Sequence, residues 1–305
     1  MKLYLAGIFT SNFDRAGRIY PKLDDAERKL RDSCEYFLES YHYIHRESAV
    51  QRIRRERNAD GTQIKVFLDS GAFSAFSQGV KIDLVKYCNY IKKNADIIDF
   101  ASVLDSIGSH VGTWHNQAAI EQQGVSVLPC YHFGEPEEVL EYYVRNYQHF
   151  TIGGLVPIST PQMQIWLDRI WGKYLTDDDG RPIRKIHGFG VTSLPMMQRY
   201  PWHSVDSSTW VQWSANGMIL LPRSGKQVDI SSLSSRRKMA NMHIDSIPQI
   251  QRQALEDEIA IEGVDPDRLR NSYYSRWAWN AWAFPMFMKL RGSCTQFKQE
   301  VMELF

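Results

Sequence analysis

The chain has 305 residues, of which 43% are hydrophobic, and its formal net charge is +1. This length suits one large domain with additions, and this hydrophobic content can fill a sizeable core. The near-zero net charge excludes a global attraction to nucleic acid, although local basic patches stay possible. The sequence shows no apolar run long enough to cross a membrane, and its first residues, MKLYLAGIFTSNFDR, turn polar too early for a signal peptide. We expect a soluble, cytoplasmic protein without membrane partners.

The four cysteines are far apart and form no CxxC pair. This spacing predicts neither a zinc ribbon nor a disulfide framework, and we expect reduced, mostly buried thiols. The residues are Cys34, Cys88, Cys130 and Cys294.

Strand-like and helix-like segments alternate along the first two thirds of the chain. The first strand is predicted at 3–8, and the first helix at 24–40, where apolar residues recur near 3.6 spacing. Further strands are predicted at 42–45, 64–68, 97–104, 125–130, 149–152, 185–189 and 202–205. Further helices are predicted at 81–94, 113–123, 135–147, 161–174 and 193–199. Eight nearly continuous apolar strands between helices favour a closed parallel sheet, a (β/α)8 TIM-like barrel of the α/β class.

The alternation stops after Asp206. An irregular or β-rich excursion follows, and then helices are predicted at about 234–260 and 266–289. We therefore expect a barrel over 1–210 that carries the catalytic residues, and a C-terminal extension over 211–305 packed on it. The aromatic run YYSRWAWNAWAFPMF is typical of a core helix, and a platform for base stacking is the alternative.

Three aspartates lie where predicted strands end. They are Asp69 in LDSGAF, Asp105 in ASVLDSIG and Asp206 in WHSVDSS. A single aspartate at such a place often only caps a helix or shapes a turn. Three of them are harder to explain by capping, because the C-terminal ends of barrel strands converge on one mouth. Two glycine turns, at 153–155 and 187–190, also follow strands and would let backbone N–H groups approach a ligand.

These residue types suit base exchange at a glycosidic carbon. One carboxylate can act as the nucleophile while a second moves protons. A third carboxylate can accept the N–H donors of a purine, and backbone N–H groups at a glycine turn can donate to its carbonyl oxygen.

The motifs resemble, in order over most of the barrel, those of the tRNA-guanine (queuine) transglycosylases and their shorter, phage-encoded relatives, which place 7-deazaguanine bases into DNA. The resemblance implies that Asp206 attacks C1′, that Asp69 is the acid/base carboxylate and that Asp105 reads the base. It implies a stacking ring at Phe73 and a ring on the other face of the base at His187, where the family has a methionine. The base-binding residues that it implies are Ser70, Phe73, Asp105, His132, Gly153, Gly154, Leu155, His187 and Gly188.

The chain also departs from this family. It lacks the CxCxxC…H zinc element of the tRNA enzymes, so no metal is expected, and no zinc subdomain. Ser207, Ser208, Thr209 and Trp210 replace a Pro-Thr-Arg segment, which favours the DNA-acting branch. His132 stands where the tRNA enzymes have a glutamine, and it either bonds a different 7-substituent or a neighbouring carbonyl group.

Two basic clusters are apparent. The first, QRIRRER at 51–57, is interpreted as a solvated helix face. The second follows Asp206 and is predicted to bind nucleic acid together with Trp210. Its members are Arg223, Lys226, Arg236, Arg237 and Lys238.

We therefore expect a pentosyltransferase that replaces guanine in DNA with a 7-deazaguanine such as preQ0 through a covalent aspartyl intermediate. Neither a redox cofactor nor ATP is expected. Two alternatives stay open: a transglycosylase that acts on tRNA, and a non-catalytic nucleic-acid-binding partner of an active subunit. The three aspartates argue against the latter, because such a subunit has no chemical need for them.

Overall fold

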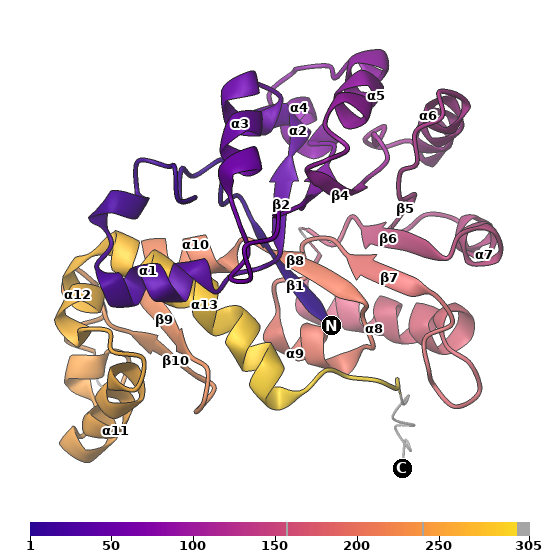
Figure 1. Ribbon diagram of the computed structural model, residues 1–305. Helices are drawn as coiled ribbons and strands as arrows, with labels where there is room; N and C mark the ends of the chain where they lie inside the picture. The colour runs from indigo at the N-terminus through magenta and orange to yellow at the C-terminus, as the bar shows by residue number, and fades with distance from the viewer. Residues whose placement is uncertain (157, 240, 298–305) are drawn as a thin grey trace, which may run out of the picture.

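The computed structural model describes residues 1–156, 158–239 and 241–297 (Figure 1). An 8-stranded, all-parallel sheet lies at its centre, with the order β4-β3-β2-β1-β8-β7-β6-β5. The strands are β1 (Lys2–Ala6), β2 (Phe37–Ser40), β3 (Val66–Asp69), β4 (Ile98–Ala101), β5 (Cys130–His132), β6 (His149–Gly153), β7 (Lys185–Gly188) and β8 (Ser204–Ser207). With its interleaved helices, the curled sheet forms the predicted (β/α)8 TIM-like fold.

The edges of the sheet, β4 and β5, meet in a short seam. A single parallel bridge joins Ser102 to Leu128, just outside the two strands. The Leu128 amide donates to the Ala101 carbonyl at 2.8 Å, and the Val103 amide donates to the Leu128 carbonyl at 2.9 Å. These bonds close the ring of strands with fewer hydrogen bonds than a regular ladder provides.

Helices connect the strands and cover the outside of the sheet (Figure 1). They are η1 (Tyr20–Lys22), α1 (Asp25–Asp32), α2 (Tyr41–Ile44), α3 (Glu47–Arg55), α4 (Ala72–Ser77), α5 (Leu84–Lys93), α6 (His110–Gln122), α7 (Glu137–Asn146), α8 (Thr160–Ile170), η2 (Trp171–Leu175) and α9 (Leu194–Arg199). Several begin at a side chain that satisfies free helix N–H groups. In α1, Asp24 and Glu27 form a reciprocal capping box.

The second strand lies earlier than the sequence predicted. The helix expected at 24–40 ends at Asp32, β2 occupies Phe37–Ser40, and the predicted strand at 42–45 falls mostly on α2. Phe37, Leu38 and Glu39 are consecutive and all buried, which suits a strand in the middle of a parallel sheet rather than one face of a helix.

The C-terminal extension begins with α10 (Thr209–Ala215), which runs across the boundary expected at 210. An antiparallel hairpin of β9 (Met218–Leu221) and β10 (Lys226–Asp229) confirms the β-rich excursion. The remaining elements are η3 (Ile244–Ser246), α11 (Gln249–Ala260), α12 (Pro266–Asn271) and α13 (Tyr273–Arg291).

Two helix predictions in this extension differ from the structure, one in where it begins and one in being divided. The helix predicted at 234–260 begins only at Gln249, after Pro248, and serine side chains before it bond to the backbone or to Asp229. The helix predicted at 266–289 is interrupted at Ser272, whose hydroxyl caps α13 by accepting from the Ser275 amide.

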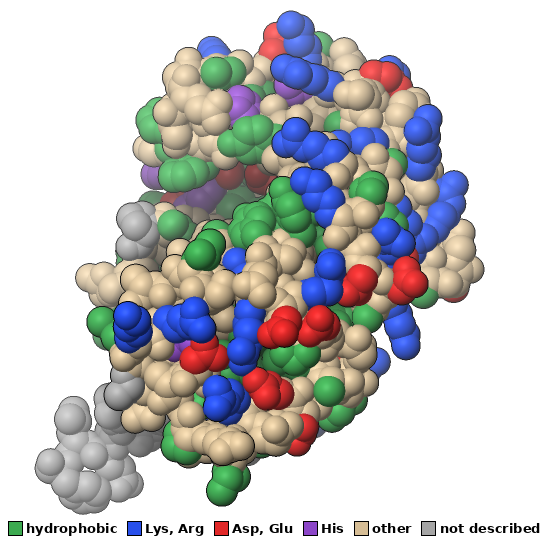
Figure 2. Space-filling model, turned by 90° about the vertical axis from the view of Figure 1, so that its left-hand side faces the viewer, with side chains coloured by type: hydrophobic (Ala, Val, Ile, Leu, Met, Phe, Trp, Pro, Cys, Tyr) green, Lys and Arg blue, Asp and Glu red, His purple; other side chains and the backbone are tan. Residues whose placement is uncertain are grey.

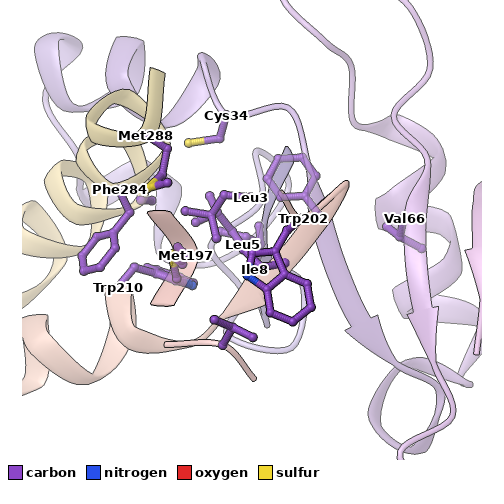
Figure 3. Packing of buried hydrophobic residues seen from close by; sticks show 14 of the residues in the cluster. Leu3, Leu5, Ile8, Cys34, Val66, Met197, Trp202, Trp210, Phe284 and Met288 are labelled. Atoms are coloured by element: carbon purple, nitrogen blue, oxygen red, sulfur yellow. The ribbon is translucent and has the colours of Figure 1, made fainter. Parts of the chain in front are cut away.

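Helix α13 packs against β1, α1 and α10. Figure 3 shows Phe284 and Met288 of α13 beside Leu3 and Leu5 of β1 and Trp210 of α10. All five side chains are buried, and burial of each contributes roughly 1.5–3 kcal/mol. The aromatic run therefore belongs to the core, as its massed aromatics predicted. In the part of the chain that the structure describes, no helix has the length and hydrophobicity to cross a bilayer.

Candidate active site

A cavity of about 540 Å³ opens where β3 to β7 end. We call it the mouth cavity. It is lined by Asp69, Ala72, Phe73, Asp105, Ser106, Ile107, Gly108, Ser109, His110, Cys130, His132, Phe133, Gly134, Glu135, Gly153, Gly154, Leu155, Val156, Phe189 and Gly190. Figure 2 looks onto a face with a recess that contains acidic and histidine side chains, with lysine and arginine side chains on the surface beside it.

Asp69 is the last residue of β3 and projects into the mouth cavity. Its Oδ2 accepts from the Gly71 amide at 3.0 Å, and its Oδ1 accepts from the Ser102 hydroxyl at 3.4 Å. Burial is the main cause that raises the pKa of Asp69, and the negative charges of Asp105 and Asp206 add to it. Together they raise the pKa to about 7. A carboxyl group with such a pKa can both donate and accept a proton near neutral pH.

Asp206 lies in β8, opposite Tyr4 of β1, and its residue is 8% exposed. The Gly190 amide donates to its Oδ1 at 2.9 Å. The Nε2 atom of His187 lies 3.4 Å from the same oxygen. Because both groups face Oδ1, the other carboxylate oxygen is left as the freer one.

His187 is fully buried in the barrel interior and does not line the mouth cavity. Its ring contacts those of Tyr4, Phe67 and Phe189. Its Nδ1 lies 2.8 Å from the Ser204 hydroxyl, and burial lowers its pKa, so the ring is neutral. This position places the imidazole behind Asp206, whereas the resemblance implied a ring facing the bound base.

Asp105 follows β4 and faces His132 across the barrel seam. The distance from its Oδ2 to the His132 Nε2 is 3.4 Å. The opposite ring nitrogen of His132 lies 2.9 Å from Glu135, whose second oxygen accepts from the His132 amide at 3.1 Å. Burial opposes protonation of His132, but Cys130, Asp105 and Glu135 outweigh it and raise the pKa of the imidazole.

The structure brings the three aspartates to the same end of the barrel. Asp69 and Asp105 line the mouth cavity directly. Asp206 does not line it but bonds to Gly190, which does, and its charge acts on Asp69.

The turn at 153–155 forms part of the cavity wall, with all three residues in the lining. Gly154 has φ +69°, a conformation that favours glycine. A Cβ at Gly153 would lie 2.9 Å from the Cys130 Sγ and 3.3 Å from the His132 ring, so this glycine leaves room for those two side chains.

The other implied base-binding residues divide into exposed and buried ones. Phe73 lines the cavity from α4 and is 63% exposed, so its ring is free to contact a ligand. Ser70 is fully buried, and its amide donates to the Ser102 hydroxyl at 3.0 Å. Gly188 faces the core, where a Cβ would lie 2.7 Å from Val191 and 2.9 Å from Trp202. Ser70 and Gly188 therefore support the wall from behind rather than line it.

The predicted nucleic-acid contact by Trp210 is wrong in this conformation. Its ring is fully buried, stacks on Phe13, and donates from Nε1 to the Ala6 carbonyl. The neighbouring basic residues are on the surface, but three of them have acidic partners. These ion pairs join Arg223 to Glu262, Arg236 to Asp229 and Arg237 to Asp245, whereas Lys226 and Lys238 are exposed.

The QRIRRER cluster is more than a solvated face. Arg52 pairs with the buried Asp14 at 2.9 Å, and Arg54 pairs with Asp96 at 2.9 Å. Arg57 bonds to backbone carbonyls, while Arg55 is exposed.

The sequence predicted no role for Cys130 or Glu135 at the mouth, and it placed Gly190 only within the glycine turn at 187–190. Gly190 holds Asp206, Glu135 orients His132, and Cys130 lies beside both His132 and Gly153. A signal for two of them was present, since Cys130, His132 and Glu135 follow one another closely in the run CYHFGEP at a strand end.

A scan against models of known protein families found no match, and a search of curated proteins found none either. Any conclusion on function therefore depends on the chemistry of the mouth cavity.

Proposed function

We propose that this chain is a base-exchange transglycosylase that replaces guanine in DNA with a 7-deazaguanine base. Two carboxylates at the mouth support this most. Asp69 has a pKa raised to about 7, and Asp206 accepts a hydrogen bond from the Gly190 amide at its Oδ1. A double displacement at a sugar carbon requires such a pair, one carboxylate as nucleophile and one as proton carrier. The mouth cavity beside them has a volume typical of small-molecule sites.

In the first half of the proposed reaction, the free oxygen of Asp206 attacks C1′ of an extruded deoxyguanosine. The bond from C1′ to the base breaks, and its electron pair leaves with guanine, which takes a proton from Asp69. The product is a covalent ester between Asp206 and the sugar. Extrusion of the nucleotide costs a few kcal/mol, which contacts in the cavity must offset.

In the second half, the incoming base returns a proton to the Asp69 carboxylate, and its nitrogen attacks C1′. The ester bond breaks, and Asp206 leaves as a carboxylate. A group that gives and then takes a proton works best with a pKa near the working pH, as Asp69 has.

The surroundings of the two carboxylates suit these roles. The Gly190 amide and the neutral His187 ring both face Oδ1 of Asp206 and so orient the attacking oxygen. Phe73 offers an exposed ring for stacking, and Asp105 and the 153–155 turn offer polar contacts to the base edge.

The direct test is mass spectrometry of nucleosides. Purified protein is incubated with preQ0 and either guanine-containing DNA or tRNA, and the digested products are analysed. We expect a 7-deazaguanine deoxynucleoside from DNA only. A modified ribonucleoside alone would assign the activity to tRNA, and no modified nucleoside from either would contradict base exchange.

A further inference from the structure

Three side chains with different donor atoms converge on one wall of the mouth cavity. They are Asp105, Cys130 and His132, and one ligand atom from each lies within 4.8 Å of the others. Sulfur, imidazole nitrogen and carboxylate oxygen are the donors that zinc takes in proteins, and three protein ligands leave a fourth position open. We propose that these residues bind a zinc-like transition-metal ion whose open position faces the cavity.

The strand geometry sets up this arrangement. Cys130 and His132 are two residues apart in β5, so their side chains point to the same side of the strand. Asp105 approaches from the end of β4 across the seam, and its Oδ2 lies 3.4 Å from the His132 Nε2. In a tetrahedral site with bonds of about 2.0–2.3 Å, neighbouring ligand atoms lie roughly 3.3–3.8 Å apart. The donor atoms of Asp105, Cys130 and His132 therefore need only small side-chain movements to reach tetrahedral spacing.

One further observation indicates a ligand at this place, and a second shows how His132 is oriented for it. The Oδ1 atom of Asp105 is buried and has no hydrogen-bond partner among the described residues. Glu135 holds the Nδ1 side of the His132 ring at 2.9 Å, which directs Nε2 toward the cluster. A carboxylate behind the imidazole is the usual outer partner of a zinc-bound histidine. Glu135 is therefore a positioning residue for the site.

Gly153 contributes space rather than a ligand. A Cβ at this position would come within 2.9 Å of the Cys130 Sγ and 3.3 Å of the His132 Cδ2. A side chain there would press on two of the three donors, so the glycine keeps the wall open for an ion.

Binding of the ion displaces the thiol proton of Cys130 and the Nε2 proton of His132, and both pass to solvent. A thiolate and a neutral imidazole remain on the metal, and the imidazole keeps its Nδ1 proton for Glu135. The open position then accepts a water molecule or a nitrogen or oxygen atom of a ligand in the cavity. Neither of the carboxylates proposed for the covalent chemistry, Asp69 and Asp206, belongs to this donor set, whereas Asp105 is shared with the proposed contact to the base edge. Cobalt binding is therefore measured without DNA or free base, so that metal binding and base exchange can each fail alone.

Cobalt titration of the metal-stripped full chain tests this proposal. We expect one equivalent of Co²⁺ to bind and to give both tetrahedral visible bands and a near-ultraviolet thiolate-to-cobalt charge-transfer band, which Zn²⁺ then removes. In Cys130→Ser the charge-transfer band disappears. Cys294→Ser is the matched control, because Cys294 is the more accessible thiol and lies outside the cluster; it retains the band.

Two further variants complete the test. Glu135→Gln keeps all three donors and should weaken metal affinity about 10- to 100-fold, as loss of an outer partner does. His132→Gln should remove the tetrahedral visible bands, which keeps the test decisive if Cys130→Ser does not fold. Folded wild-type protein that binds no cobalt, or a charge-transfer band that survives in Cys130→Ser, would overturn the proposal. The nucleoside assay with metal-stripped protein reports on base exchange separately.

Discussion

At the scale of single residues, the site depends on where each carboxylate sits relative to water and to the other charges. Burial of Asp69, and then the charges of two neighbouring carboxylates, raise its pKa to about 7. Asp206 is less exposed to solvent, and one of its oxygens accepts a hydrogen bond from the Gly190 amide. Similar side chains at strand ends therefore acquire different chemistry from their surroundings.

Asp69→Asn should make the protein more stable at pH 8 than the wild type. The pKa of Asp69 in the folded protein lies above its ordinary value of 3.8, so ionisation of this group destabilises the native state as pH rises from about 4 through 7. Asparagine does not ionise, and the gain should be on the order of 2 kcal/mol after allowing for partial exposure. Urea denaturation at pH 8 and pH 4 measures it. The difference should shrink toward zero at pH 4, and an equal gain at both pH values would refute the assignment.

Phe73→Ala should weaken binding of the free base. Stacking on an aromatic ring is worth about 1–3 kcal/mol per base, so the KM for the base should rise roughly tenfold or more. Phe76→Ala is a matched control, because both phenylalanines lie on α4 and are 63% exposed but only Phe73 lines the mouth cavity. Steady-state kinetics with labelled base would separate them. Equal effects of the two variants would argue against a stacking role.

Between the larger elements, Asn280 of α13 makes hydrogen bonds to both the β9–β10 hairpin and α10. Asn280 is fully buried and accepts from the Leu220 amide at 3.0 Å. Its amide group donates to the Met218 carbonyl and to the Ser214 hydroxyl, both at 2.9 Å. Three elements of the C-terminal extension therefore share this residue.

Asn280→Ala should lower the free energy of unfolding by about 2–4 kcal/mol, because it leaves the buried Leu220 amide and the half-buried Met218 carbonyl without this partner. Ile250→Ala on α11 is the control; its side chain is 87% exposed, so the change should stay within about 0.5 kcal/mol. Chemical denaturation measures both variants, and hydrogen exchange should show faster exchange of the Leu220 amide. An unchanged Leu220 exchange rate in Asn280→Ala would contradict this packing.

At the scale of the whole molecule, the sequence predicted the barrel and the position of its acidic mouth. Asp69, Asp105 and Asp206 could be placed together because parallel strands present their C-terminal ends on one side, whatever their separation in the chain. The pattern of apolar runs located six of the eight strands, and the fifth prediction, at 125–130, shares only Cys130 with β5. The second strand was misplaced because Phe37 and Leu38 fit a helical spacing. They form a strand because they pair with β1 and β3 in the sheet.

Side-chain direction was the part that the sequence could not predict. Trp210 looked available to nucleic acid, yet α13 covers it with Trp277, which is distant in the chain. His187 looked like a base contact, yet Ser204 and Asp206 hold its ring inside the barrel. The positions of these rings depend on residues that are distant in the sequence, so the local spacing of residue types does not predict them.

The proposed reaction requires Asp206 to form a covalent bond to C1′ of the sugar. Wild-type protein is incubated with a guanine-containing DNA oligomer, denatured, and examined by intact mass and by peptide mapping. We expect a denaturation-resistant adduct on the peptide that contains Asp206, and a folded Asp206→Asn variant that forms no adduct and exchanges no base. An adduct that persists in Asp206→Asn, or base exchange at a near-normal rate by that variant, would show that Asp206 is not the nucleophile.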